Sequence, residues 1–296
     1  MGSDLTKAYS KLRKFTKVDR NIDLSKKCTF QIGGRARIFA EPSSVEELLK
    51  ILETVKEHNL KYVIIGNGSN ILFESSGFEG VIIKMSRFNH YEIHGTKVVA
   101  DAGVNLTQLI KDAVNHGLQG LEDGYLIPAT IGGAVMMNAC AFKFITSDHI
   151  SSVLALVDGK IKLLSKEDCK FGYRSNIFKD GDIILRVQFD LSRGDKKILQ
   201  SRLKEIIELR KLKINNTPSA GCVFENPKGY FAGQLIDESG FKGYKLGGAM
   251  VSETHANIIY NVGGATSEDV KTLIRLITEK VKELYNIELK MEIKNY

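Results

Sequence analysis

Apolar residues recur at helical spacing in three stretches of the chain. The first follows Ser43-Ser44-Val45-Glu46, a capping-box arrangement, and predicts a helix that runs to Asn59. The second predicts a helix that ends at Gly117, and the third predicts a long helix near the end of the chain. A charged stretch over 195–213 predicts a fourth helix. The apolar positions of the three stretches are Val45, Leu48, Leu49, Leu52 and Val55; Leu106, Leu109, Ile110, Ala113 and Val114; and Val270, Leu273, Ile274, Ile277, Val281 and Leu284.

Short apolar runs between these helices predict strands. They cover residues 62–65, 81–84, 97–103, 151–157, 160–164 and 182–191. In the last residues of the chain, Ile287, Leu289, Met291 and Ile293 alternate with Glu288, Lys290, Glu292 and Lys294. This alternation predicts a closing strand with Glu292 on its polar side.

The order of these elements predicts an α+β protein in four consecutive parts. Residues 1–19 form an N-terminal extension, and 20–85 form a small mixed unit in which the first helix covers a sheet. A second unit spans 86–194, and a third spans 195–296 with a loop-rich centre over 215–250.

Composition narrows the class of protein. A chain of 296 residues with 43% hydrophobic and 26% charged residues is long enough for more than one folded core. The net charge of +7 is spread along the chain among 35 acidic residues, which favours a small phosphate-bearing ligand over a long nucleic acid. The four cysteines lie far apart and predict neither a zinc site nor a disulfide framework. No apolar run is long enough for a membrane span or a signal-peptide core, so we expect a cytoplasmic protein.

A glycine-rich turn, Gly66-Asn67-Gly68-Ser69-Asn70, directly follows a predicted buried strand. Glycine lets successive backbone N–H groups come close to a pyrophosphate, yet a tight turn between strands explains the same residues. Ile131-Gly132-Gly133-Ala134 has the same two interpretations, an anion-facing helix start or a packing turn. Neither motif alone decides between them.

Taken in order along the chain, these motifs and several others resemble one family. The ordered set resembles the UDP-N-acetylenolpyruvoylglucosamine reductase family of peptidoglycan precursor synthesis, over roughly residues 20 to 296. It comprises Thr29-Phe30-Gln31-Ile32-Gly33-Gly34, Gly66-Asn67-Gly68-Ser69-Asn70, Gly120-Leu121-Glu122, Ile127-Pro128-Ala129-Thr130-Ile131-Gly132-Gly133-Ala134, Met137-Asn138-Ala139, Tyr173-Arg174, Gly221-Cys222-Val223-Phe224, Phe231-Ala232-Gly233 and His255-Ala256-Asn257.

The resemblance implies a two-part FAD-binding region of the PCMH type, as in vanillyl-alcohol oxidases, followed by an α+β substrate-binding domain. It implies a shorter subclass that lacks a tyrosine loop over the substrate. NADPH would be the co-substrate, a UDP-sugar enolpyruvyl compound the substrate, and neither nucleic acid nor membrane a partner; we expect a monomer. The implied FAD contacts are Gly66, Asn67, Gly68, Ser69, Asn70, Ile127, Pro128, Ala129, Thr130, Gly132, Gly133 and Ala134.

The same resemblance assigns the chemistry. Arg174 and Glu292 would contact the substrate carboxyl group, Glu292 usefully so if burial keeps it protonated. Such groups are needed because an enol ether accepts hydride poorly unless charge on the forming enolate is stabilised. Cys222 stands where many members have the serine that protonates the α-carbon, and a thiol with an ordinary pKa of about 8.5 is a stronger acid than an alcohol. Tyr173, Asn226 and Gln234 would bind substrate.

Several positions depart from the family pattern. Leu126, Ala129 and Cys140 replace common glycines, Thr130 replaces serine, and Gln234 replaces a frequent lysine. Leu126 and Ala129 leave the backbone path beside FAD open, and Gln234 leaves a phosphate contact open. His90, His94 and His255 do not predict a metal site.

Two other functions remain alternatives. A flavin oxidase of the same superfamily acting on another acid would keep the fold and change the reaction. A basic protein that binds nucleotides or nucleic acids without catalysis would explain the +7 charge, although no RNA-binding motif or helix-turn-helix is visible.

Overall fold

The computed structural model describes residues 2–213 and 217–296, which group into two compact units. Unit 1 comprises Met1–Asp19, Ile38–Asn67 and Val81–Arg210, and unit 2 comprises Arg20–Arg37, Gly68–Gly80 and Lys211–Tyr296. Each unit is therefore built from separated stretches of the chain. The four consecutive domains expected from the sequence stay a prediction.

The first core of unit 1 forms beneath two helices. The helix predicted from Ser43 is confirmed as α2 (Val45–Glu57), whose N-cap Ser44 accepts a hydrogen bond from the Glu47 N–H. Its buried positions include Leu48 and Ile51, while Leu49 is 40% exposed. Helix α1 (Gly2–Leu12) packs against α2 and buries Ala8 and Leu12 in the same core. The associated sheet has the order β1-β2-β5-β3, with β1 (Lys17–Asp23), β2 (Arg35–Glu41), β5 (Phe78–Lys84) and β3 (Lys61–Ile65).

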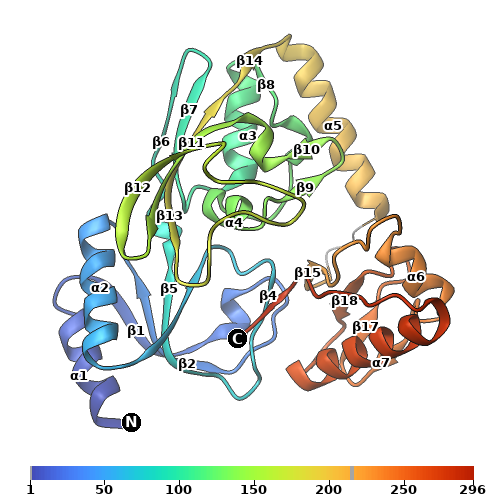
Figure 1. The fold of residues 1–296 in the computed structure, drawn as a ribbon, viewed down its shortest axis with the longest axis horizontal. Coiled ribbons are helices and arrows are strands. Elements are labelled where there is room, and N and C mark those ends of the chain that lie inside the picture. The colour runs from blue at the N-terminus through green and yellow to red at the C-terminus, as the bar shows by residue number, and fades with distance from the viewer. Residues whose placement is uncertain (1, 214–216) are drawn as a thin grey trace. The chain divides into compact units, whose positions relative to one another are not determined.

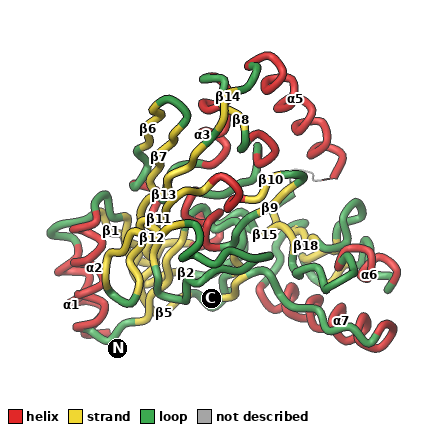
Figure 2. The backbone as a smooth tube through the Cα atoms, turned by 45° about the horizontal axis from the view of Figure 1, so that its top comes forward, coloured by secondary structure: helices red, strands yellow, loops and turns green. Residues whose placement is uncertain are grey.

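The second core of unit 1 packs on a five-stranded antiparallel sheet (Figure 2). The strands predicted over 97–103, 151–157, 160–164 and 182–191 are all present in it, and alternate residues such as Val153, Ala155 and Val187 are fully buried. Helix α4 (Ile131–Met136) packs on β13 and β7, and α3 (Leu106–Asn115) adds its apolar face to the same core. The sheet order is β12 (Lys160–Ser165), β11 (Ile150–Val157), β13 (Ile183–Asp190), β7 (Lys97–Asp101) and β6 (Tyr91–His94), and short pairs join β8 (Leu118–Gln119) to β14 (Ser192–Arg193) and β9 (Cys140–Ala141) to β10 (Phe144–Ile145).

Unit 2 contains a four-stranded antiparallel sheet next to a long helix (Figure 1). The helix, α7 (Ser267–Tyr285), begins with a capping box between Thr266 and Asp269 and buries the predicted apolar stripe except for Leu284. The predicted charged helix is α5 (Lys196–Lys213), of which all but the last residues belong to unit 1. The sheet order is β15 (Ser219–Cys222), β18 (Ile258–Asn261), β17 (Ala249–Val251) and β16 (Lys245–Leu246), and α6 (Ala232–Glu238) packs on α7.

The closing strand predicted from the alternation between Ile287 and Lys294 is wrong for most of its length. Regular pairing is confined to β19 (Lys294–Asn295), which runs parallel to β4 (Ile71–Leu72), and to one bridge between Phe224 and Met291. The segment bonds first to residues 223–225 and then to residues 70–74, so no single partner extends a ladder along it. The alternation also breaks, because Met291 is 46% exposed whereas Glu292 is only 9% exposed.

Within the described residues, no helix is both long enough and apolar enough to cross a bilayer.

Candidate functional site

Unit 1 brings the first half of the glycine-rich turn against the segment around Thr130. The Asn67 side chain donates its Nδ2–H to the Pro128 carbonyl at 3.3 Å. A Cβ atom on Gly66 would lie 2.2 Å from Thr130 Oγ1, so only glycine fits there without a shift. Two of the segments expected to hold FAD therefore lie together, although 60 residues of sequence separate them.

The backbone N–H groups around α4 already have protein acceptors. The N–H groups of Ile131 and Gly132 donate to the carbonyls of Val104 and Ala102 at 2.9 and 2.8 Å. Thr130, the N-cap of α4, accepts the Gly133 N–H on its side-chain oxygen at 3.3 Å. These bonds favour the packing interpretation of this helix start over a row of N–H groups that face an anion.

The segment nevertheless leaves room for a ligand. A Cβ built on Gly133 would meet, among the described atoms within 4 Å, the Thr130 hydroxyl alone, at 3.3 Å. The Cα surface of Gly133 is therefore open to close approach, as a dinucleotide phosphate requires. Gly133 meets this requirement, and an FAD contact of the adjoining Gly66, Asn67 and Thr130 stays a prediction.

Leu126 and Ala129 follow different backbone paths in this segment. Leu126 has a φ of +65°, the left-handed conformation that glycine adopts without strain, and it is 37% exposed. Ala129 is 8% exposed, and its N–H donates to the Ile127 carbonyl at 2.8 Å. Position 126 thus has a backbone conformation that favours glycine, although the residue there is leucine.

Arg174 lies in a tight turn of unit 1, with Gly172 and Ser175 paired on either side of it. Its φ is +50°, and its guanidinium lies 5.9 Å from the centre of the Tyr173 ring. The buried Asn138 donates to the Gly172 carbonyl at 2.8 Å, and Asn176 donates to the last carbonyls of α4. Tyr173 and Arg174 lie in this turn. The two amides attach the turn to the C-terminal end of α4.

In unit 2, Cys222 ends strand β15 next to an irregularity in the pairing. The register with β18 shifts between Ser219 and Cys222, and Gly221 inside the shift has a φ of +75°. Apart from Gly221 itself and its two chain neighbours, no described residue has an atom within 4 Å of the position that a Cβ on Gly221 would take. The bulge therefore leaves open space directly before the half-buried Cys222.

The backbone after Cys222 holds Glu292. The Glu292 N–H donates to the Val223 carbonyl at 2.8 Å, and the side chain of Glu292 is buried rather than on a solvated strand face. The buried Asn257 supports the other side of this strand, because its side chain accepts from the Phe224 N–H and donates to the Phe224 carbonyl at 2.9 and 2.7 Å. Within unit 2, the backbone of Glu292 is thus bonded to the residue that follows Cys222.

The remaining predicted residues have structural contacts of their own. Asn226 accepts the Ala232 N–H at 2.9 Å and so supports the start of α6. Gln234 is exposed on α6 and donates to Glu238 at 2.8 Å. Their roles toward substrate stay predictions.

The second half of the glycine-rich turn belongs to unit 2. Gly68 has a φ of +65°, and its carbonyl accepts the Thr29 N–H at 3.2 Å. Ser69 follows it half-buried, and Asn70 donates its side-chain Nδ2–H to the Glu292 carbonyl at 3.1 Å. No pattern in the sequence predicts this contact. The same holds for the contacts of Asn138 and Asn257, because a buried asparagine carries no periodic signal.

Two other thiols are buried and inert. Burial raises the pKa of the Cys28 thiol, and burial with the nearby carboxylates of Asp168 and Glu167 raises the pKa of Cys169 to about 11. Among the side chains that the structure describes, no group of three or more His, Cys, Asp or Glu could hold a metal ion.

The chain matches two family models, an FAD binding domain over residues 36–164 and the C-terminal domain of UDP-N-acetylenolpyruvoylglucosamine reductase over residues 213–296. It is 37% identical to the UDP-N-acetylenolpyruvoylglucosamine reductase of Caldanaerobacter subterraneus subsp. tengcongensis, over 99% of this chain and 98% of that protein.

Solved structures agree. The crystal structure of the UDP-N-acetylenolpyruvylglucosamine reductase of Thermus caldophilus matches with a TM-score of 0.82 and 34% identity, over 95% of this chain and 100% of that one. That of p-cresol methylhydroxylase matches with a TM-score of 0.50 and 14% identity, over 98% of this chain and 66% of that one, which shows a shared fold alone. With motifs, fold and near full-length relatives in agreement, the chain belongs to the UDP-N-acetylenolpyruvoylglucosamine reductase family.

Proposed function

We propose that the protein is an FAD-dependent reductase that uses NADPH to convert UDP-N-acetylglucosamine enolpyruvate to UDP-N-acetylmuramate in peptidoglycan precursor synthesis. Family membership supports the substrate, and the match to an FAD binding domain supports the cofactor. The main structural support for this site is that Glu292 is buried and that its backbone N–H donates to the carbonyl of Val223, the residue after Cys222.

Bound FAD would supply the redox chemistry, which is hydride transfer from NADPH to the β-carbon of the enolpyruvyl group. We assign Gly66, Asn67, Thr130 and Gly133 of unit 1 to its phosphates, because their two segments lie together and Gly133 is open to close approach. Gly68, Ser69, Ile127, Pro128, Ala129, Gly132 and Ala134 complete the proposed contact set, and Asn70 is left out of it because its side-chain amide donates to the Glu292 carbonyl.

The protein's own residues handle charge and protons. Hydride addition at the β-carbon places negative charge on the α-carbon and its carboxyl group, where the Arg174 guanidinium and the buried Glu292 carboxyl stabilise it. The Cys222 thiol gives its proton to the α-carbon, and the resulting thiolate is reprotonated from solvent. The double bond thus gains one hydride and one proton. Tyr173, Asn226 and Gln234 position the UDP-sugar.

The role of Cys222 is tested by separating the two half-reactions. In Cys222→Ala, reduction of bound FAD by NADPH should proceed at the wild-type rate, whereas reoxidation by the enolpyruvyl substrate should fall by about 10²-fold or more. Cys222→Ser should keep measurable reoxidation. Equal losses in both half-reactions would reject the assignment.

Cys140→Ala is the matched control, since Cys140 is also a half-buried thiol. It should leave both half-reactions unchanged. Rapid reoxidation of the reduced flavin by oxygen, without a response to the substrate, would instead indicate an oxidase.

The substrates also suggest where the protein works. NADPH and UDP-sugars are metabolites of the cytoplasm, so we place the reaction there, with the protein as a monomer. Sedimentation of the FAD-loaded protein would check the oligomeric state.

A further inference from the structure

Asn70 and Glu292 are joined by a hydrogen bond across 222 positions of sequence. The donor is the Asn70 side-chain amide, and the acceptor is the backbone carbonyl of Glu292, at 3.1 Å. Resemblance places Asn70 among the cofactor residues, but its amide is directed to the backbone of a residue assigned to catalysis.

The Glu292 backbone is held on both sides by this arrangement. Its N–H donates to the Val223 carbonyl at 2.8 Å, and its carbonyl accepts from Asn70. Because residues 287–293 form no regular strand, individual hydrogen bonds of this kind hold the segment in place instead of a strand ladder. Losing the Asn70 bond frees the carbonyl side of the residue that carries the buried carboxyl group.

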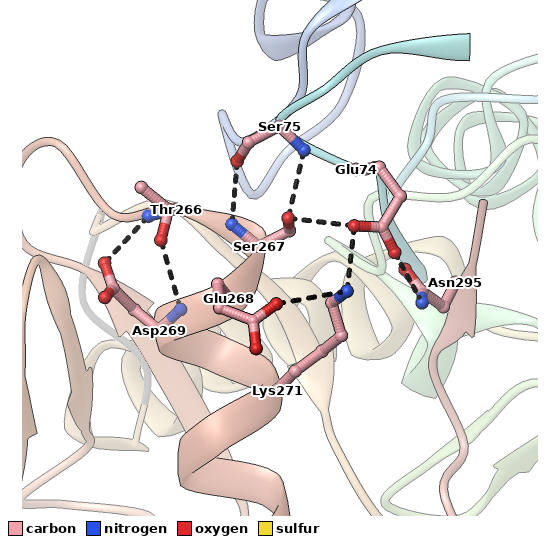
Figure 3. A network of polar contacts seen from close by, with 8 residues as sticks. All are labelled: Glu74, Ser75, Thr266, Ser267, Glu268, Asp269, Lys271 and Asn295. Atoms are coloured by element: carbon pink, nitrogen blue, oxygen red, sulfur yellow. Dashed lines mark hydrogen bonds and ion pairs between the residues drawn. The ribbon is translucent and has the colours of Figure 1, made fainter. Parts of the chain in front are cut away.

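The end of the chain is fixed by separate contacts. Asn295 donates to Glu74 at 2.9 Å, and Glu74 also pairs with Lys271 and accepts from Ser267 of α7 (Figure 3). β19 pairs with β4 in addition. A change at Asn70 therefore leaves the C-terminal segment attached and acts locally on residue 292.

We propose that Asn70 is a positioning residue for Glu292, which acts by fixing the residue-292 peptide rather than by touching the substrate. The inference rests on the proposed function, in which Glu292 stabilises the enolate. A displacement of about 1 Å in a group that acts on the reacting atoms can reduce the rate about 10²-fold, so a single amide contact is sufficient to matter.

The test uses the FAD-loaded full-length chain and measures flavin reduction by NADPH and flavin reoxidation by the enolpyruvyl substrate. Asn70→Ala removes the donor, and Asn70→Asp keeps the size of the side chain but directs an acceptor at the carbonyl. Both should slow reoxidation about 10- to 100-fold and leave FAD affinity and NADPH reduction within about threefold of wild type. Asn70→Asp serves as the second variant if Asn70→Ala does not fold.

Asn261→Ala is the matched control. Asn261 also donates its side-chain amide to backbone carbonyls in unit 2, those of Phe30 and Gln31 at 3.2 Å each. Its loss should lower the melting temperature without changing the reoxidation rate. A merely structural role for Asn70 would give the same pattern and would overturn the proposal.

Glu292→Ala separates this inference from the proposed function. If Asn70→Ala causes no further loss of reoxidation in the Glu292→Ala background, Asn70 acts through Glu292. If the two losses multiply, or if Asn70→Ala weakens FAD binding while the FAD-saturated enzyme reoxidises normally, the positioning role is wrong and Glu292 keeps its own. If Glu292→Ala reoxidises at the wild-type rate, the proposed function of Glu292 fails, and the inference fails with it.

Discussion

The hydroxyl of Thr130 occupies the space that any side chain at position 66 would need. A Cβ on Gly66 would lie 2.2 Å from Thr130 Oγ1, the same oxygen that caps α4. Gly66→Ala should therefore destabilise the protein by about 1–3 kcal/mol, since the Thr130 side chain that it would meet is buried. It should also weaken FAD binding by displacing the α4 cap. Urea unfolding and flavin titration measure the two effects.

Thr130→Ala provides the background that tests the cause. Without the hydroxyl, the nearest atom of residue 130 would be its Cβ, at 3.3 Å from the new methyl group. Gly66→Ala should then cost much less than in the wild-type protein, so that the two substitutions are not additive. Additive losses would show that the clash with Thr130 is not the reason for glycine at position 66.

At position 126, the glycine variant should be more stable than the alanine variant, which is the reverse of the usual order. Its φ of +65° disfavours any residue with a Cβ by about 1–2 kcal/mol. Leu126→Ala and Leu126→Gly both remove the side-chain contacts, so their difference isolates the backbone. We expect Leu126→Gly to be the more stable of the two by about 1 kcal/mol in urea unfolding.

Leu49 is the matched control, because it lies in α2 with an exposed fraction of 40%, close to the 37% of Leu126. There Leu49→Ala should be more stable than Leu49→Gly by about 1 kcal/mol, as helix propensities require. The same order at both positions would contradict the strain assigned to Leu126.

The regular elements were predictable because a repeated pattern encodes them. The helices that carry Leu48, Leu109 and Leu273 and the strand that carries Val153 bury one face against a core, so their apolar spacing is visible in the sequence. The prediction of the closing strand was wrong because its apolar spacing does not correspond to one buried face. Residues 287–293 do alternate, but their backbone bonds change partner and Glu292 turns inward, which no local pattern records.

The residues of the candidate site come from the resemblance and stay a prediction, whereas their contacts come from the structure. The resemblance assigns Gly66, Thr130, Cys222 and Glu292 to the site. The linking bonds of Asn70, Asn138 and Asn257 join segments that are distant in sequence. Such contacts depend on tertiary structure alone, since an asparagine amide reaches any carbonyl that the fold brings near it.

The four thiols should react with iodoacetamide in an order set by burial. Burial, with the Asp168 and Glu167 carboxylates, raises the pKa of Cys169 to about 11, so about one part in a thousand is thiolate at pH 8. Cys28 is also buried, with a raised pKa. We expect mass spectrometry to find Cys140 and Cys222, which are half-buried, modified first. Cys169 should be modified at least about 10²-fold more slowly than an ordinary thiol.

Labelling of the unfolded protein is the control for this order of thiol reactivity. In urea all four thiols should react at similar rates, because burial no longer separates them. Fast labelling of Cys169 in the folded protein would contradict its burial in the core of unit 1.

Glu74 should make stability depend on pH through its contacts with α7 and the C-terminal strand. Burial raises the pKa of this carboxyl, but hydrogen bonds from Lys271, Asn295 and Ser267 outweigh burial and hold the pKa below the ordinary 4.5 (Figure 3). A pKa that is lower in the folded state means that the contribution is complete above about pH 4.5 and is lost as the pH falls through the folded value. Glu74→Gln should therefore lower the free energy of unfolding by about 1–2 kcal/mol at pH 7. The difference from wild type should shrink as the pH falls below 4.5.

Glu268→Gln is the matched control, because Glu268 pairs with the same Lys271, at 3.5 Å, yet is 78% exposed. An exposed pair of this kind contributes about 0–1 kcal/mol, so this variant should stay close to wild type over the whole pH range. If Glu268→Gln matched Glu74→Gln in size and pH dependence, the effect would belong to the general charge of α7. A loss confined to Glu74→Gln would assign it to the bonds that join residue 74 to Ser267 and Asn295.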